Sequence, residues 1–94
     1  NDIEKETIIL RFTQTRFPYV TSKPIHKSQT TVNEKECTIS LSVKPTRELE
    51  QQILSYGSDV EVLSPESLRL QIAEKIADNY KKYFTMQNER IGSI

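Results

Sequence analysis

Hydrophobic and polar positions alternate most clearly in two segments of the chain, residues 7–12 and residues 37–44. Successive side chains of a β-strand point to opposite faces, so apolar residues at every second position mark one buried face. These positions are Ile8, Leu10 and Phe12 in the first segment and Cys37, Ile39, Leu41 and Val43 in the second. Each segment therefore predicts a strand with one apolar and one polar face.

Two weaker elements lie between these strands. Residues 16–22 favour a short helix, because proline is tolerated in the first helical turn and Pro24 acts as a stop. Residues 28–32 are polar and β-branched, and residues 33–36 (NEKE) have the character of a turn. We expect residues 28–32 to pair with residues 37–44 in a hairpin.

The second half of the chain predicts a helix followed by a short strand. Thr46 can cap a helix over residues 47–56, and Gly57 supplies the left-handed residue that ends it. Apolar side chains share one side of this helix at Leu49, Ile53 and Tyr56. Residues 59–63 follow as a strand with its two valines on one face.

A longer helix is predicted over residues 65–84. Ser64, Pro65 and Glu66 give it a strong start, with a cap, a proline at the first helical position and an acid in the first turn. Its apolar positions at helical spacing are Leu68, Ile72, Ile76, Tyr80 and Tyr83 or Phe84. Residues 85–94 are polar and are expected to form a flexible tail.

The predicted order of elements is β–α–β–β–α–β–α, which is typical of an α+β fold. The first six elements match the ferredoxin-like βαββαβ arrangement, with an antiparallel four-stranded sheet and an additional C-terminal helix. Residues 7–12 and 37–44 become the central strands, and both main helices lie on one sheet face. The additional helix must bury its apolar side on the open sheet face, on the helix layer or on a second subunit.

Length and composition narrow the choice of function. The 94 residues are expected to form a single domain, residues 1–94. The 13 basic residues balance 13 acidic ones, which argues against a strongly electrostatic nucleic-acid binder. Cys37 is the only cysteine, so the sequence predicts neither a disulfide nor a metal site and favours a reducing, cytoplasmic location. No apolar run approaches the ~20 residues of a membrane span, so we expect no membrane partner.

The stretch ELEQQILSYGSDVEVLSPESLRLQI, residues 48–72, resembles the C-terminal extension (WCX) domain of bacterial WYL transcriptional regulators. The family pattern there is a helix ending in an aromatic–glycine pair, a Val-x-Val-Leu strand and a proline-opened helix with leucine at its start. The matching residues are Tyr56, Gly57, Val60, Val62, Leu63, Pro65 and Leu68. The His-x-Ser-Gln step at residues 26–29 is also similar, and the resemblance extends over residues 10–83. One departure is the turn at residues 33–36, which lacks the Asp-Gly or Asn-Gly pair often seen there.

The resemblance implies a regulatory role without catalysis. Such regulators combine an N-terminal winged helix-turn-helix, a central WYL domain that senses a ligand, and this C-terminal domain. The chain is therefore expected to be a fragment of a longer regulator whose helix-turn-helix and WYL domains are absent from it. The implied partners are a second copy in a homodimer, the WYL domain of the same chain, and DNA only through the absent N-terminal domain. The implied function is dimerisation and transmission of effector state to the DNA-binding domain. From the residues themselves we expect the helix at residues 65–84 to exchange or pack between subunits, because its apolar side is longer than a four-stranded sheet needs.

The competing hypothesis is an effector-binding module, for a nucleotide or a nucleic acid, that completes a pocket with the WYL domain. Its candidate ligand-binding residues are Arg11, Arg16, His26, Lys27 and Gln29. Together these side chains would form a modest positive patch able to pair with phosphate. Structural roles compete with this interpretation, because His26 could bond to the backbone and Arg11 could be a solvated charge on the open sheet face.

Enzyme interpretations find little support in the sequence. Acylphosphatases share the predicted layout but need a glycine-rich anion loop after the first strand, and residues 13–16 (TQTR) contain no glycine. RNA-recognition domains place aromatic residues on the open face of the central strands, where this chain has Thr38, Ser40 and Ser42. We therefore expect no enzymatic activity, no catalytic residues, no metal site and no cofactor.

Overall fold

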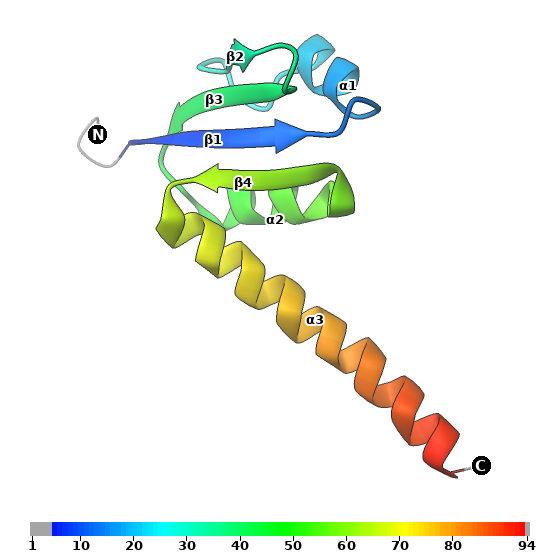
Figure 1. The fold of residues 1–94 in the computed structure, drawn as a ribbon. Coiled ribbons are helices and arrows are strands. Elements are labelled where there is room, and N and C mark those ends of the chain that lie inside the picture. The colour runs from blue at the N-terminus through cyan, green and yellow to red at the C-terminus, as the bar shows by residue number, and fades with distance from the viewer. Residues whose placement is uncertain (1–4, 94) are drawn as a thin grey trace.

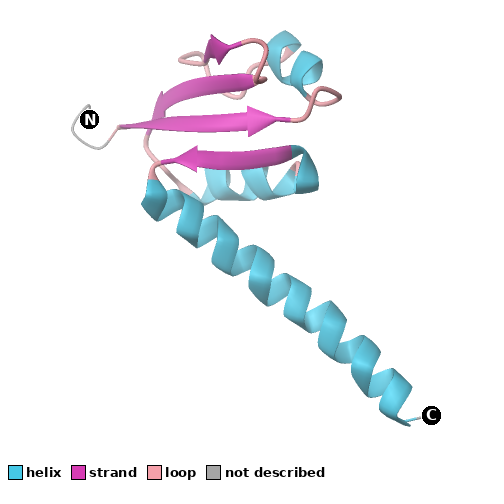
Figure 2. Cartoon of the chain, viewed as in Figure 1, coloured by secondary structure: helices cyan, strands magenta, loops and turns pink. Residues whose placement is uncertain are grey.

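Four strands and three α-helices make up the computed structural model, which describes residues 5–93 and the side chains of residues 5–84 (Figures 1 and 2). The elements are β1 (Glu6–Phe12), α1 (Phe17–Ser22), β2 (Thr30–Asn33), β3 (Thr38–Val43), α2 (Arg47–Ser55), a 3₁₀ turn (Gly57–Asp59), β4 (Val60–Ser64) and α3 (Glu66–Ser93). Their types and order agree with the predicted α+β fold, except for the short 3₁₀ turn, which the sequence did not indicate.

The strands form one sheet in the order β2–β3–β1–β4, with every neighbouring pair antiparallel. The prediction that β1 and β3 occupy the centre is confirmed. The register places Ile8 opposite Leu41, and Leu10 opposite both Ile39 and Val62. The apolar positions that alternate along each strand thus meet on a single face of the sheet.

One hydrophobic cluster fills the space between that face and the helices. α1 contributes Val20 to it, and α2 contributes Leu49 and Ile53. The ring of Phe12 at the end of β1 meets the ring of Tyr56 edge to face, with centroids 5.4 Å apart. Full burial of an aliphatic or aromatic side chain stabilises a fold by roughly 1.5–3 kcal/mol. Ile8, Leu10, Ile39 and Leu41 are completely buried, so they anchor the sheet.

Both ends of α2 form as the sequence predicts. The Thr46 hydroxyl oxygen accepts a hydrogen bond of 3.2 Å from the backbone N–H of Leu49, which satisfies one of the unpaired donors in the first turn. After the helix, Gly57 adopts a φ of 61°, a left-handed conformation that costs glycine little. The chain then turns back into β4, which lies at the edge of the sheet beside β1.

The hairpin between β2 and β3 differs from its predicted bounds. β2 begins at Thr30 instead of residue 28, because the Ser28 hydroxyl oxygen accepts the Ser42 N–H that a longer ladder would have used. β3 begins at Thr38, because Cys37 has a φ of 53° and belongs to the turn. With no glycine in the NEKE sequence, the reversal uses a left-handed cysteine and a 3.1 Å bond from the Glu36 N–H to the Asn33 carboxamide.

α3 packs on the body only through its first turns. Leu68 and Ile72 are buried against β4 and α2, and the helix then runs away from the sheet (Figure 1). The radius of gyration is 15.9 Å, whereas a compact domain of 100 residues has about 13 Å. The backbone is helical through Ser93. The sequence predicts a flexible tail at residues 85–94. The side chains of these residues lie outside the described part of the chain, so the flexibility stays a prediction.

Candidate functional site

Two of the predicted ligand-binding residues, His26 and Lys27, line an open hollow of about 540 Å³. The hollow lies between the loop that precedes β2, the end of β3 and the first turns of α2. Its other lining residues are Lys5, Ile25, Ser42, Val43, Lys44, Thr46, Glu48, Leu49 and Gln52. The loop and α2 thus bring cationic, hydroxyl and apolar side chains to one place on the surface.

Lysine side chains from separate parts of the chain give the hollow its charge. Lys5, Lys27 and Lys44 line it together with a single carboxylate, Glu48, among the described residues. The antiparallel register pairs Glu6 with Val43, so Lys5 and Lys44 stand opposite each other just beyond the paired residues. Sequence reasoning missed both lysines, because nothing in a linear pattern specifies the register of β1 on β3.

Hydrogen bonds to Ser28 hold the His26 ring in place. The backbone N–H of Ser28 lies 3.0 Å from Nδ1, and the Ser28 hydroxyl lies 2.8 Å from the same atom. A backbone N–H can only donate, so Nδ1 acts as the acceptor and the neutral ring carries its proton on Nε2. His26 therefore has the backbone-bonding role considered above, and it also offers one ring N–H for other contacts.

Gln29 holds the loop before β2 against α1. Its carboxamide oxygen accepts a 2.9 Å hydrogen bond from the Ile25 N–H, and its amide nitrogen donates at 3.1 Å to the Val20 carbonyl. Both ends of the side chain are thus used inside the fold, and Gln29 is not among the residues that line the hollow. Its contribution to a site is to fix the loop that carries His26 and Lys27.

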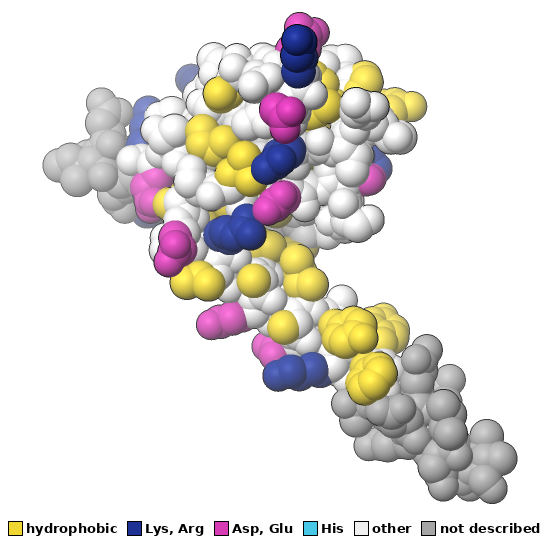
Figure 3. Space-filling view, viewed as in Figure 1, with side chains coloured by type: hydrophobic (Ala, Val, Ile, Leu, Met, Phe, Trp, Pro, Cys, Tyr) yellow, Lys and Arg dark blue, Asp and Glu magenta, His cyan; other side chains and the backbone are white. Residues whose placement is uncertain are grey.

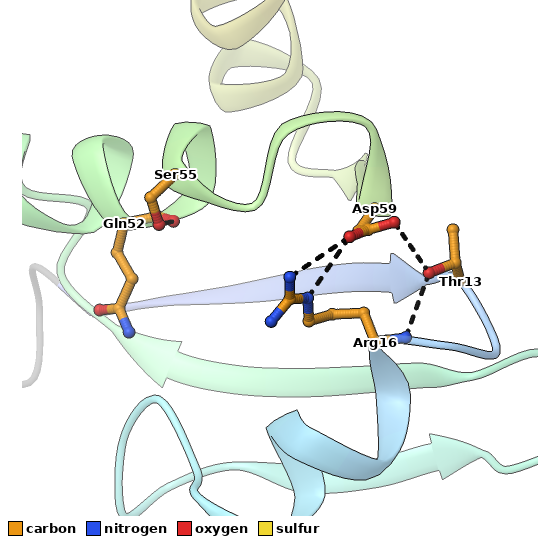
Figure 4. Close-up of polar contacts among 5 residues, drawn as sticks. All are labelled: Thr13, Arg16, Gln52, Ser55 and Asp59. Atoms are coloured by element: carbon orange, nitrogen blue, oxygen red, sulfur yellow. Dashed lines mark hydrogen bonds and ion pairs between the residues drawn. The ribbon is translucent and has the colours of Figure 1, made fainter.

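Arg16 lies at the other end of the sheet, in an ion pair with Asp59 (Figure 4). Its Nε and Nη2 atoms each lie 3.4 Å from the same carboxylate oxygen, and the guanidinium sits over the rings of Tyr19 and Tyr56 at 5.9 and 5.8 Å. The Thr13 hydroxyl donates to Asp59 at 3.2 Å. This cluster ties the loop after β1 to the turn before β4, away from the hollow.

Arg11 is exposed on the open face of the sheet and pairs with Glu36 at 3.6 Å. Next to it, Glu61 pairs with Arg69 of α3 at 2.8 Å. The hydrogen bond from Arg69 lowers the pKa of Glu61, partial burial opposes this, and the charges of Arg69 and Arg11 lower it further. Figure 3 shows such basic and acidic side chains close together over the sheet. The structure thus places Arg11 in a surface network of charges, outside the hollow.

A second surface lies on α3, where it leaves the body of the domain. Ile76, Tyr80, Tyr83 and Phe84 are 52%, 65%, 69% and 50% exposed, and we call these four residues the α3 stripe (Figure 3). The rings of Tyr80 and Phe84 stack with their centroids 5.8 Å apart. The helical spacing correctly puts these residues on one side of the helix. The stripe nevertheless faces solvent, since Leu68 and Ile72 are the buried residues among the described side chains of α3.

An apolar groove of about 460 Å³ adjoins the α3 stripe. It opens between the C-terminal end of α2, β4 and the first turns of α3. Its apolar walls are Ile53, Leu54, Val60, Val62, Ile72 and Ile76. Ile76 belongs both to the groove and to the stripe, so the two form one continuous apolar surface.

Among the residues that the structure describes, no three histidine, cysteine or acidic side chains stand close enough together to hold a metal ion. No helix there has the length and apolarity that crossing a membrane requires.

Comparison with known proteins adds one match. The family model described as the WCX domain matches residues 4–78, which covers the sheet, α1, α2 and the packed part of α3. A search of curated proteins finds no match to the chain.

Proposed function

The chain belongs to the WCX domain family, and we propose that it is the C-terminal dimerisation and regulatory domain of a WYL-type transcriptional regulator. In this proposal it has no enzymatic activity, works in the cytoplasm, and reaches DNA only through an N-terminal domain of the full regulator. The strand order β2–β3–β1–β4, with α1 and α2 sharing one core, supports a ferredoxin-like arrangement for the body.

The α3 stripe is the observation that carries the proposal. An amphipathic helix normally buries its apolar side, but every described side chain of α3 beyond Ile72 is exposed, and those of the stripe are at least half exposed. The charged residues at positions 74, 75, 78, 81 and 82 lie outside the stripe at 100° per residue, so the stripe itself is uncharged. Of these, Lys75 lines the groove and pairs with Glu50 of α2. An uncharged aromatic surface on a protruding helix is typical of a protein–protein contact.

A second copy of the chain is the partner that fits this surface best. Every copy carries both a convex aromatic stripe and an apolar groove, so two copies related by a two-fold axis can each insert the stripe into the groove of the other. Ile72 to Phe84 spans about 18 Å of helix at 1.5 Å per residue. Antiparallel helices would then place the aromatic end of one copy beside Ile72 and Ile76 of its partner.

The area available is sufficient for such a dimer. Aromatic side chains cover roughly 150–250 Å² each, so half to two-thirds exposure leaves on the order of 100 Å² per ring. The buried surface is the sum of the aromatic rings of both copies and the groove walls that these rings cover. It reaches on the order of 1,000 Å², which is in the lower range of specific interfaces. A dimer held in this way would set the distance between the two DNA-binding domains of the regulator. An effector that changes this distance would change the affinity for the operator.

The test uses a full-length regulator that carries this domain. Replacing Tyr80 and Phe84 together by serine should weaken operator binding by at least about tenfold, because a dimer gains affinity from two linked contacts. Circular dichroism should show an unchanged fold, since both rings are half-exposed or more. Tyr19→Ser is the matched control, because Tyr19 is 66% exposed and lies on α1. Operator affinity that is the same for all three proteins would contradict the proposal.

Effector binding is a second candidate function. It is favoured by the observation that His26 and Lys27 line the same hollow, as the sequence hypothesis expected of a ligand-facing edge. In this version the hollow completes a pocket with the WYL domain of the regulator. Replacing Lys27 by glutamate in the full-length protein should then abolish the effector response while the dimer persists.

A further inference from the structure

We infer that the ion pair between Lys75 of α3 and Glu50 of α2 is the contact that prepares the apolar groove for a second copy of the chain. This inference rests on the proposed dimer, and it names the residues on which the groove of that dimer depends. Lys75 and Glu50 are positioning residues in it, because they act through the charge and the walls of the groove that receives the aromatic stripe.

Lys75 gives the apolar groove its charge. Among the described residues that line the groove, Lys75 alone is charged, and the polar residues beside it are Ser58 and Asn79. An ammonium group that a partner covers loses its water, which is costly unless an opposite charge compensates it. The groove can therefore receive an aromatic surface only if the charge of Lys75 is neutralised.

Glu50 supplies the compensating charge. Its carboxylate accepts a hydrogen bond from the Lys75 ammonium group, and its side chain is only 14% exposed, whereas that of Lys75 is 44% exposed. Glu50 is not among the described residues that line the groove. The carboxylate thus neutralises Lys75 without presenting a charge of its own to a partner, and the attraction between the two groups strengthens when a partner excludes water.

The same ion pair holds α3 on the side that lines the groove. Arg69 and Lys75 are three residues before and three residues after Ile72, so at about 100° per residue they lie on opposite sides of that buried residue. Arg69 binds β4 through Glu61 and the Val62 carbonyl. Lys75 binds α2. The helix is thus held from both sides, next to the point where its side chains become exposed.

Loss of the ion pair should affect the dimer more than the fold of one chain. In the monomer, Leu68 and Ile72 still anchor α3 through their buried side chains, and water reaches Lys75 because it is nearly half exposed. In the dimer, the stripe of the partner would exclude that water. A charge without its partner would then remain inside an apolar contact and weaken it.

The experiment measures the dimer Kd of the 94-residue chain by sedimentation equilibrium for the wild type and three variants. The variants are Glu50→Lys, Lys75→Glu and the double variant that exchanges the two charges. Each single variant places two like charges at the contact between α2 and α3, and should raise the Kd at least about tenfold. The double variant restores an ion pair in the reverse order, so its Kd should return to within about fivefold of the wild-type value.

Glu74→Lys is the matched control. It reverses one acidic charge, as Glu50→Lys does, at an exposed residue of α3 that belongs neither to the groove nor to the stripe, and it should change the Kd less than about twofold. Circular dichroism and urea unfolding show whether each variant is folded. If Glu50→Lys does not fold because its position is largely buried, Lys75→Glu and the double variant still provide the comparison.

A dimer Kd that stays within about twofold of the wild-type value in the folded single variants would overturn the inference and leave the proposed dimer intact. A double variant that dimerises as weakly as the single ones would also overturn it, because the two residues would then not act as a pair. A wild-type chain that is monomeric at every concentration would instead contradict the proposed dimer, and this inference with it. Failure of the inference and failure of the proposed function are therefore distinguishable.

Discussion

Arg69 joins α3 to the edge of the sheet through two contacts of one side chain. Its Nη1 atom donates to the Glu61 carboxylate at 2.8 Å and to the Val62 carbonyl at 2.7 Å. The second bond satisfies an acceptor on an edge strand that has no neighbouring strand on that side. The side chain thus ties the start of α3 to β4.

This contact makes stability depend on pH. A carboxyl whose pKa is lowered in the folded state adds stability above its unfolded pKa, about 4.3 for glutamate, and loses it as the pH falls through the folded value. Glu61→Gln should therefore destabilise the domain at pH 7, by less than about 1 kcal/mol because the pair is half exposed, and should have a smaller effect near pH 3. Urea unfolding at the two pH values measures the difference, and an equal effect at both would contradict the assignment.

Cys37 combines a buried side chain with a left-handed backbone. Its side chain is 6% exposed and its φ is 53°. Valine is more apolar than cysteine, yet it is strongly disfavoured in this conformation. We expect Cys37→Val to cost about 2 kcal/mol or more and Cys37→Ala only about 1 kcal/mol. A denaturation series in which valine is the better tolerated residue would show that burial, and not the backbone, decides at this position.

At the scale of elements, the key question is where α3 stops being part of the core. Ile72 is 6% exposed and Ile76, one turn later, is 52% exposed. Ile72→Asp should cost about 3 kcal/mol or more, because it buries an unpaired charge, whereas Ile76→Asp should cost less than about 1 kcal/mol in the monomer. The measurement is urea unfolding at a concentration low enough to keep the chain monomeric. Equal losses for the two variants would mean that Ile76 is packed as a core residue.

The same elements show what a sequence can predict. Alternation in β1 and β3, the Thr46 cap and the terminator Gly57 are local signals, and the structure confirms them. Helical spacing likewise groups Ile76 with Ile72 correctly. It does not say how far the body of the domain extends along the helix, so a stripe that resembles core faces solvent instead.

The candidate site was predictable only in part, because some of its residues are brought together by contacts between distant parts of the chain. His26 and Lys27 are neighbours in sequence, and the structure brings both to one hollow. Lys5 and Lys44 join them through the register of β1 on β3, which is a long-range property. Arg16 was grouped with them by charge, but its guanidinium pairs with Asp59, which lies 43 residues away in sequence. Pairings between distant residues are what a linear pattern leaves undetermined.

At the scale of the whole molecule, the chain is a small α+β body with a protruding helix. Its longest dimension is 53 Å and its shortest 19 Å. A chain of this size has little room for both a large ligand cavity and a full core. Its distinctive surfaces are the α3 stripe, the groove beside it and the hollow beside His26 and Lys27. These features suit a domain that contacts partners, as proposed for the C-terminal part of a regulator.

Sedimentation equilibrium of the 94-residue chain at micromolar concentration tests the central claim most directly. The account predicts a species of twice the 10.9 kDa of one chain, which the Tyr80→Ser, Phe84→Ser double variant converts to monomer without unfolding it. A wild-type chain that stays at 10.9 kDa across the whole concentration range would contradict the claim that the α3 stripe is a dimer interface.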